Sequence, residues 1–405
     1  MIPTLYLTRN GLLEPLGRSQ VFAYLQGLSR DHRITLITYE KAEDRTDVAR
    51  MARARAECEK LGIDWLPQRF LARPRGIAPA VGALHMVWLV FRVVRGRRVR
   101  LIHARSYIPA FVALGVGRLT GASFIFDMRA LWPEELITAG RLRRGSPLHR
   151  AIVAAERTCL KRAAAVVSLT HAAVDHLKKV YPAELAGQRI AVIPTCADLD
   201  RFVPAARPPA QRAIGCLGTV LSGWFRLDWL VAFFAAAARR DPDLVLELTT
   251  RDDPGPIRAA FARESDLAGR LQIASSPSDK VQEVIQRQIA SVMFFTDGLG
   301  KLGSSPTRMG EILGCGIPVV ANEGVGDVAR IIRHYRVGVL ARGASAKDMD
   351  AAWDELQALL ADADLPARCR RAAEEVFSLS AGTAAYARLY AEILAATEQK
   401  QLLNA

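Results

Sequence analysis

The sequence predicts an α/β protein made of two doubly wound domains, each built around a mostly parallel sheet. Its 405 residues, half of them hydrophobic and 24% charged, suit two globular domains with buried cores. Short apolar or β-branched runs alternate with longer helical patterns along the chain, as they do in βαβ units. A proline-rich segment at 203–209 divides these runs into two sets and indicates a linker.

Each set contains six expected strands. In chain order, the first set is 2–8, 33–39, 99–103, 123–127, 164–169 and 190–193. The second set is 214–217, 244–249, 271–274, 290–296, 317–321 and 336–340. Helical patterns between them include 18–30, 147–162, 172–180 and 227–240. We therefore expect one domain over 1–205 and a second over 210–380.

The last segment, 381–405, is expected to form one more helix. Apolar side chains recur there with the spacing of an amphipathic helix, at Tyr386, Leu389, Tyr390, Ile393 and Leu394. From the residues alone, the simplest interpretation is a helix that packs on its own domain.

The excess of positive over negative charge lies in the first half of the chain. Residues 1–200 hold 31 basic and 17 acidic residues, whereas 201–405 hold 24 of each. The segment 76–100 joins an apolar stretch to five arginines, a combination that suits contact with an anionic membrane surface. A partly buried helix ending in a solvated basic turn is the alternative. Nucleic-acid binding is not expected, because valines rather than stacking aromatic residues separate those arginines.

The cysteines and the uncharged segments indicate the cellular location of the protein. The six cysteines have no C-x-x-C pattern and no cluster with histidine, which argues against a disulfide framework and a structural zinc site. The longest uncharged stretch, 76–91, is shorter than a membrane span needs. No signal peptide is recognised, so we expect a cytoplasmic protein, peripheral at most on the inner face of the cell membrane.

The segment 301–311 is the strongest candidate for an anion site. Ser305 is a suitable N-cap and Pro306 a suitable first helical residue, so a helix is expected to begin there. Its unpaired N–H groups, together with Lys301 and Arg308, would favour a diphosphate. Glu311 lies further along the helix, where its carboxylate could accept hydrogen bonds from sugar hydroxyls. An ordinary capped helix with a surface arginine is the alternative.

A glycine turn follows the expected strand 317–321. Gly324, Gly326 and Ala329 fit the G-x-G-x-x-A dinucleotide fingerprint. The turn comes late in its domain rather than after the first strand, so we interpret it as a close approach of backbone to a ligand. An NAD-dependent oxidoreductase or a sugar-nucleotide epimerase is the alternative interpretation.

In the first domain, candidate ligand residues follow three expected strands at their carboxyl ends, the edge where open parallel sheets bind ligands. The loop after 2–8 holds Gly11, Glu14 and Gly17, and Arg105 follows 99–103. Asp127 ends the strand 123–127, and Arg129 and Glu134 come after it. A structural ion pair between Asp127 and Arg129 is the alternative interpretation.

No metal site is assigned. The D-x-D pattern of metal-dependent glycosyltransferases occurs four times, at 198–200, 241–243, 348–350 and 362–364, which shows that it is too common to be informative here. The histidines lack the H-E-x-x-H spacing of zinc enzymes, and no P-loop is present.

Taken together, these segments resemble the family-4 (group 1) retaining glycosyltransferases of the GT-B fold. The resemblance runs through Asn10–Gln20, Phe126–Arg129, Ile193–Phe202, Ser305–Glu311 and Gly324–Val328. It implies two Rossmann-like domains facing across a cleft, with the acceptor on the first domain and the nucleotide-sugar donor on the second. It also implies that the last helix crosses back to the first domain, and that no cofactor is needed.

The resemblance assigns roles to the candidate residues. It implies a catalytic set of Asp127, Lys301, Arg308 and Glu311, in which Glu311 anchors the donor ribose. It implies donor binding by Gly218, Thr219, Arg226, Ser304, Ser305, Thr307, Gly324 and Gly326, and acceptor binding by Gly11, Glu14, Gly17, Arg105, Arg129 and Glu134. In two places the sequence departs from the family. Gly303 stands where a first glutamate is usual, and 218–226 has no lysine.

The expected activity is transfer of a sugar from a nucleotide-sugar to a lipid-linked or polysaccharide acceptor in cell-surface glycan biosynthesis. The alternatives are the epimerase or oxidoreductase, a nucleic-acid binder, and a GT-B-like protein without catalysis.

Overall fold

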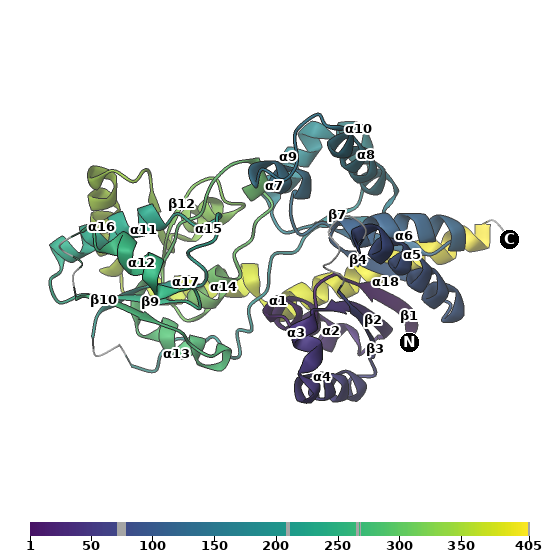
Figure 1. The fold of residues 1–405 in the computed structure, drawn as a ribbon, viewed down its shortest axis with the longest axis horizontal. Coiled ribbons are helices and arrows are strands. Elements are labelled where there is room, and N and C mark those ends of the chain that lie inside the picture. The colour runs from purple at the N-terminus through teal and green to yellow at the C-terminus, as the bar shows by residue number, and fades with distance from the viewer. Residues whose placement is uncertain (71–77, 208–210, 265–266, 268, 404–405) are drawn as a thin grey trace. The chain divides into compact units, whose positions relative to one another are not determined.

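The computed structural model describes residues 1–70, 78–207, 211–264, 267 and 269–403. They form two compact units, one made of Met1–Pro194 with Leu379–Ala405 and the other of Thr195–Ser378. Each unit is a parallel sheet flanked by helices (Figure 1). The prediction of two doubly wound α/β domains is therefore confirmed.

The first unit holds a seven-stranded sheet in the order β3-β2-β1-β4-β5-β6-β7, with every neighbouring pair parallel. Its strands are β1 (Ile2–Leu7), β2 (His32–Glu40), β3 (Asp64–Arg69), β4 (Leu101–Arg105), β5 (Ser123–Asp127), β6 (Ala165–Ser168) and β7 (Ile190–Val192). Its helical segments are α1 (Pro15–Gly17), η1 (Arg18–Phe22), α2 (Ala23–Leu28), α3 (Ala42–Thr46), α4 (Val48–Lys60), α5 (Ala78–Gly96), α6 (Tyr107–Thr120), α7 (Trp132–Thr138), α8 (Pro147–Arg162), α9 (His171–Val180), α10 (Pro182–Leu185) and α18 (Leu379–Leu403).

The seventh strand, β3, is absent from the six that the sequence predicts. Its residues, Asp-Trp-Leu-Pro-Gln-Arg, do not form an apolar run. Pro67 is compatible with a strand here because β3 lies at the edge of the sheet, where one side of the strand needs no hydrogen-bond partner. The pattern 18–30 also differs from one regular helix, because η1 is a π-helical turn between α1 and α2.

The second unit holds a six-stranded parallel sheet in the order β10-β9-β8-β11-β12-β13. Its strands are β8 (Ala213–Leu217), β9 (Val245–Thr249), β10 (Leu271–Ala274), β11 (Gln288–Met293), β12 (Val319–Asn322) and β13 (Gly338–Ala341). Its helical segments are α11 (Leu227–Arg240), α12 (Pro254–Phe261), η3 (Ser278–Lys280), α13 (Val281–Gln286), η4 (Leu299–Lys301), α14 (Thr307–Gly314), α15 (Val328–Tyr335), α16 (Ala346–Leu360) and α17 (Leu365–Phe377).

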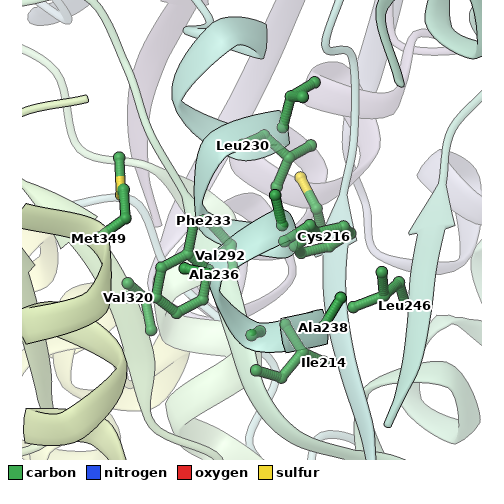
Figure 2. Packing of buried hydrophobic residues seen from close by; sticks show 14 of the residues in the cluster. Ile214, Cys216, Leu230, Phe233, Ala236, Ala238, Leu246, Val292, Val320 and Met349 are labelled. Carbon is green, nitrogen blue, oxygen red and sulfur yellow. The ribbon is translucent and has the colours of Figure 1, made fainter. Parts of the chain in front are cut away.

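The core of the second unit explains why the sequence of α11 predicts a helix so clearly. Leu230, Phe233 and Ala236 on this helix are buried against Ile214 and Val292 of the sheet (Figure 2). Four consecutive alanines, 235–238, let the helix approach the strands closely, and all four are buried. Apolar residues cover most of this helix, as expected for one packed between a sheet and neighbouring helices.

The boundary between the units precedes the predicted proline-rich linker, of which 208–209 lie outside the described residues. The residues after Pro194 already belong to the second unit. Ala197 donates its N–H to the carbonyl of Phe377 at 2.7 Å, and Leu199 and Phe202 are buried in the core around α14 and α17. Burial of these apolar side chains holds 195–202 to the second unit.

The final helix, α18, belongs to the first unit although the chain reaches it from the second. It packs along α2 (Figure 1). Gly382 allows this close approach, because a Cβ at that position would lie 2.9 Å from the Tyr24 ring. Tyr386 and Tyr390, two residues of the apolar stripe predicted from the sequence, are fully buried in the first unit.

Candidate functional site

In both sheets the order of the strands reverses at an equivalent place. In the first unit the strand order reverses between β1 and β4, and in the second between β8 and β11. Loops that leave such a reversal at the carboxyl ends of the strands diverge and leave room for a ligand. Several of the sequence-predicted site residues lie in the loops after β1, β8 and β11, and others follow β5 and β12.

In the second unit, the loop after β8 is shaped by a carboxylate that the sequence analysis did not single out. Gly218 has a φ of 111°, a conformation that side chains rarely adopt, and Thr219 follows it. Asp252 accepts hydrogen bonds from the N–H groups of Val220 and Leu221 at 2.7 and 2.9 Å. These bonds fix the course of the loop beside Thr219.

Lys301, at the end of η4 after β11, is a nearly buried cation. Its side chain is packed over the ring of Trp224, with Nζ 3.7 Å from the centroid, and the residue is only 8% exposed. Its carbonyl accepts the N–H groups of Ser304 and Gly326, at 3.0 and 2.9 Å. The structure thus brings Lys301 together with two predicted donor-binding positions, one of them in the glycine turn after β12.

Asp297 lies beside both Arg226 and Gly324. Arg226 Nη2 lies 3.2 Å from Asp297 Oδ1. A Cβ at Gly324 would lie 2.7 Å from the Cβ of Asp297, and φ at Gly324 is 83°. Glycine is therefore required there by close packing as well as by backbone conformation.

Asn322, the last residue of β12, ties the two ligand-edge loops together. Its Oδ1 accepts the N–H of Phe295 at 2.9 Å, and its Nδ2 donates to the carbonyl of Phe295 at 2.9 Å. The side chain thus takes the place of backbone hydrogen bonds between β11 and β12, just after the pairing of these strands ends. Sequence reasoning missed this residue, although a polar residue at the end of an apolar strand, before a glycine turn, is a usable signal.

The helix α14 begins at Thr307, with Pro306 as its N-cap and no side-chain capping bond. The prediction that Ser305 caps this helix is wrong. Its hydroxyl lies 3.0 Å from Thr195 Oγ1 and accepts the Thr195 N–H at 3.3 Å. Ser305 therefore ties the start of α14 to the segment that enters this unit.

Arg308 and Glu311 form an ion pair within α14. Arg308 Nη1 donates to Glu311 Oε2 at 2.6 Å. The arginine side chain is 40% exposed and the glutamate side chain 13%. The guanidinium thus keeps access to solvent from the first turn of the helix, where backbone N–H groups and the helix dipole also favour an anion.

In the first unit, buried Glu40 organises the loop that follows β1. Its Oε1 accepts the N–H of Leu12 at 2.7 Å, and Thr38 donates its hydroxyl to the same oxygen at 2.6 Å. A Cβ at Gly11 would lie 2.5 Å from Glu40 Oε2, and one at Gly17 would lie 1.9 Å from the carbonyl oxygen of Gly11. Both glycines are therefore required by close packing inside the loop.

We expect Gly17→Ala to destabilise the protein by about 1–3 kcal/mol, because the added methyl group overlaps the Gly11 carbonyl. Urea unfolding would measure the change. Gly115→Ala is the matched control, since nothing lies within 4 Å of a Cβ there and alanine favours the helix α6. Equal stability of Gly17→Ala and the wild type would contradict the packing argument.

Two charged residues contact Asn10 in the same loop. Arg105, at the end of β4 and 6% exposed, donates from Nη1 to Asn10 Oδ1 at 2.9 Å. Glu14 accepts from Asn10 Nδ2 at 3.3 Å and pairs with Lys41 at 3.3 Å. The hydrogen bond and charge of Glu14 raise the pKa of Lys41. The structure therefore brings Arg105 and Glu14 to one side-chain amide.

Asp127 is the centre of a buried polar cluster. It ends β5 and is 0% exposed. His103 Nε2 lies 3.2 Å from its Oδ2, the Tyr386 hydroxyl donates to the same oxygen at 3.3 Å, and Arg129 Nη1 lies 3.6 Å from Oδ1. The ion pair between Asp127 and Arg129 that the sequence left as an alternative is present.

The charges within this cluster follow from burial and pairing. Burial acts to raise the pKa of the Asp127 carboxyl, but Arg129 and His103 outweigh it and hold that pKa below its ordinary value. Burial lowers the pKa of His103, so its ring is neutral near pH 7. Because the ionised Asp127 can only accept, Nε2 of this ring carries the proton, and the Tyr390 hydroxyl, 2.6 Å from His103 Nδ1, donates to that nitrogen. Helix α18 is thereby joined to β4 and β5.

His103, Tyr386 and Tyr390 were not among the predicted site residues. His103 could have been found, because it lies two positions before Arg105 on a strand and so shares its face. Glu134 makes a different contact, a bidentate pair of its carboxylate with Arg144 at 3.0 and 2.5 Å. Among the described residues, no group of three or more histidine, cysteine, aspartate or glutamate side chains could hold a metal ion.

Comparison with known proteins identifies the first unit's fold and the fold of the whole chain. The model of the glycosyl transferase 4-like domain matches residues 19–196. No curated protein matches the sequence.

Three solved structures illustrate the likeness in fold. Sucrose-phosphate synthase from Thermosynechococcus elongatus is 15% identical, with a TM-score of 0.70 over 98% of this chain and 100% of that one. HepE from Anabaena, solved with UDP-glucose, is 15% identical, with a TM-score of 0.66 over 97% and 100%. A Listeria monocytogenes protein assigned as a UDP-N-acetylglucosamine 2-epimerase is 12% identical, with a TM-score of 0.61 over 98% and 97%.

Proposed function

We propose that the protein transfers a sugar from a nucleotide-sugar, with retention of anomeric configuration. Residues 19–196 match the model of the glycosyl transferase 4-like domain, and the whole chain shares its fold with solved GT-B glycosyltransferases, which supports this proposal. The proposed acceptor is a lipid-linked or polysaccharide glycan of the cell surface. The second unit binds the donor and the first unit binds the acceptor.

The observation that carries this proposal is the set of cations at the carboxyl edge of β8, β11 and β12. Lys301 is held over Trp224 with little exposure, beside the glycine turn of Gly324 and Gly326. Arg308 extends from the first turn of α14 with part of its guanidinium exposed. A cation in a poorly solvated site and a helix N-terminus both favour a diphosphate.

The chemistry needs these groups when the sugar leaves. The bond between the anomeric carbon and the diphosphate oxygen breaks, and a bond from that carbon to an acceptor hydroxyl oxygen forms. The products are the glycoside, the nucleoside diphosphate and a proton. Negative charge develops on the departing diphosphate, so preorganised cations and N–H groups lower the barrier. No metal or other cofactor is part of this proposal.

Glu311 is proposed to anchor the donor ribose. Its pairing with Arg308 holds the carboxylate on the same side of α14 as the guanidinium, at 2.6 Å. Because its side chain is 13% exposed, a ribose hydroxyl would need only a small rearrangement to reach it. UDP-glucose, which HepE was solved with, is the first donor to test.

The test is a thermal-shift screen of UDP-, GDP- and TDP-sugars on the full chain. We expect one nucleotide class to raise the melting temperature, because a ligand that binds only the folded state stabilises it by about 2.7 kcal/mol at a hundred times its Kd. The matching donor should then release nucleoside diphosphate when a glycan acceptor is present.

Two outcomes would overturn the proposal. No stabilisation by any nucleotide-sugar would contradict the donor site. Acceptor-independent interconversion of two UDP-sugars, followed by NMR of the sugar anomeric protons, would instead indicate an epimerase, a class that shares this fold.

A further inference from the structure

Helix α5 in the first unit has apolar side chains on both faces. Met86, Leu89 and Val90 are buried inward against the unit. The outward side also carries large apolar side chains. The exposed fraction is 48% for Val81, 72% for Leu84, 41% for Val87, 53% for Trp88 and 39% for Phe91. A surface helix of a soluble protein ordinarily carries polar residues on this side.

The exposed stripe runs into arginines at the end of the helix. Leu84, Trp88 and Phe91 lie one helical turn apart, and Arg95 continues the same spacing to the end of the helix. The exposed Arg98 follows in the turn after Gly96. Arg92 is placed over the Trp88 ring, with its guanidinium carbon 4.8 Å from the ring centroid. The outward side is thus apolar along most of its length and cationic at its carboxyl end.

The stretch of chain around α5 carries no acidic residue of its own, although Arg97 pairs with Asp64 just before it and Arg100 pairs with Glu398 of α18. Residues 65–126, which span α5, β4 and α6, hold ten arginines and neither aspartate nor glutamate. Helix α6 packs beside α5, and its last turn exposes Arg118 and Leu119, the latter 72% exposed. The pairing of apolar and basic side chains therefore continues on the neighbouring helix.

Two cavities flank α5 beside these arginines. One, of about 400 Å³, is lined by Arg95, Arg98 and Arg100. The other, of about 580 Å³, is lined by His85, Trp88 and Arg92, together with Leu66 and Gln68 of β3. Cationic recesses next to an apolar stripe suit the phosphate groups of lipids whose acyl region receives the apolar side chains.

We propose that the exposed side of α5 from Val81 onward, together with Arg98 in the turn that follows it and Leu119 of α6, binds the surface of an anionic lipid bilayer. Trp88 and Phe91 enter the interface between headgroups and acyl chains, and the arginines pair with lipid phosphates. No described helix is long and apolar enough to cross a membrane. This contact goes beyond the proposed sugar transfer and does not depend on it, although it would place the first unit where lipid-linked acceptors lie.

The experiment is flotation of the full chain with phosphatidylcholine vesicles, with and without phosphatidylglycerol. We expect flotation only with the anionic vesicles, weakening as salt is raised. Replacing Arg92, Arg95 and Arg98 by glutamine should lower the partition coefficient about fivefold for each arginine, or about a hundredfold together. The triple change Leu84→Ser, Trp88→Ser and Phe91→Ser should abolish flotation.

A matched control removes the same charge elsewhere in the first unit. Arg141, Arg143 and Arg150 are exposed, and Leu148 nearby is 61% exposed. Changing these arginines to glutamine and Leu148 to serine should leave flotation unchanged. All variants should keep the melting temperature and the nucleotide-sugar shift of the wild type, which separates failure of this proposal from failure of the donor site.

Three results would overturn the membrane contact. The first is absence of flotation with anionic vesicles, and the second is equal loss in the control variant. The third is tighter salt-sensitive binding of the wild type to a random single-stranded oligonucleotide than to the vesicles, which would identify a nucleic-acid surface instead.

Discussion

Arg308→Ala is expected to lower kcat/KM for sugar transfer by about 10²–10³-fold, while the protein stays folded. Arg308 contributes its charge at the first turn of α14, where the donor diphosphate is proposed to bind. Among the described residues, its side chain forms one ion pair, with Glu311, and because the guanidinium is 40% exposed this pair is worth about 1 kcal/mol or less. Steady-state kinetics with the donor from the nucleotide-sugar screen, together with the melting temperature, would measure both effects.

Two further variants sharpen this prediction. Arg308→Lys should fall between the wild type and the alanine variant, because lysine keeps the charge but loses the bidentate guanidinium geometry. Arg333→Ala is the matched control, since Arg333 on α15 also pairs with a single glutamate, Glu323, in a more exposed contact. Near-normal transfer by Arg308→Ala would refute the donor-site assignment, as would an equal loss in the Arg333 variant.

Asp127→Asn is expected to lower the free energy of unfolding by about 3–5 kcal/mol at pH 7. Removing one member of a buried ion pair leaves the other charge without compensation. Here the uncompensated charges are Arg129 and Arg105, and Asp127 itself is 0% exposed. Urea unfolding followed by circular dichroism would measure the change. The exposed Asp175 on α9 provides the control Asp175→Asn, expected to alter stability by about 0.5 kcal/mol or less.

The pH dependence of this difference has a defined sign. The pKa of Asp127 is lower in the folded protein than its ordinary value of 3.8. Its stabilising contribution is therefore fully present above that value and is lost as the pH falls through the folded pKa. The gap between wild type and Asp127→Asn should be constant near neutral pH and shrink in acid.

The same variant separates two roles for Asp127. The sequence suggested a catalytic carboxylate, whereas its contacts join β5, Arg129 and α18 inside the first unit. A structural role predicts that activity per folded molecule largely survives. Unchanged stability with selective loss of transfer would support the catalytic prediction instead.

Much of the candidate site could be predicted because it lies in loops that follow strands. The runs that became β8, β11 and β12 are apolar and short, so Gly218, Lys301 and Gly324 could be placed at one sheet edge from the sequence alone. The contacts within that edge could not be predicted. The Trp224 ring under Lys301, the carboxylate of Asp252 and the amide of Asn322 reach their partners across 77, 32 and 27 positions of sequence respectively.

Errors of the sequence analysis fall where tertiary contacts compete with local signals. Ser305 has the residue type of an N-cap, but its hydroxyl is taken by Thr195, which folding brings beside it. The strand β3 lacks an apolar run because an edge strand needs burial on few of its positions. The proline-rich segment suggested the boundary, whereas burial of Leu199 and Phe202 placed it earlier.

By itself, the sequence determined the two-domain α/β architecture, the candidate ligand edge of each sheet and the excess of positive charge in the first half. These follow from periodicity, composition and strand order, which are local or additive properties. Only the tertiary structure decided that Asp127 is enclosed by His103, Arg129 and Tyr386, and that the apolar residues of α5 lie on both of its faces. Both depend on tertiary contacts between segments that are distant in sequence, and the local pattern of residues does not specify those contacts.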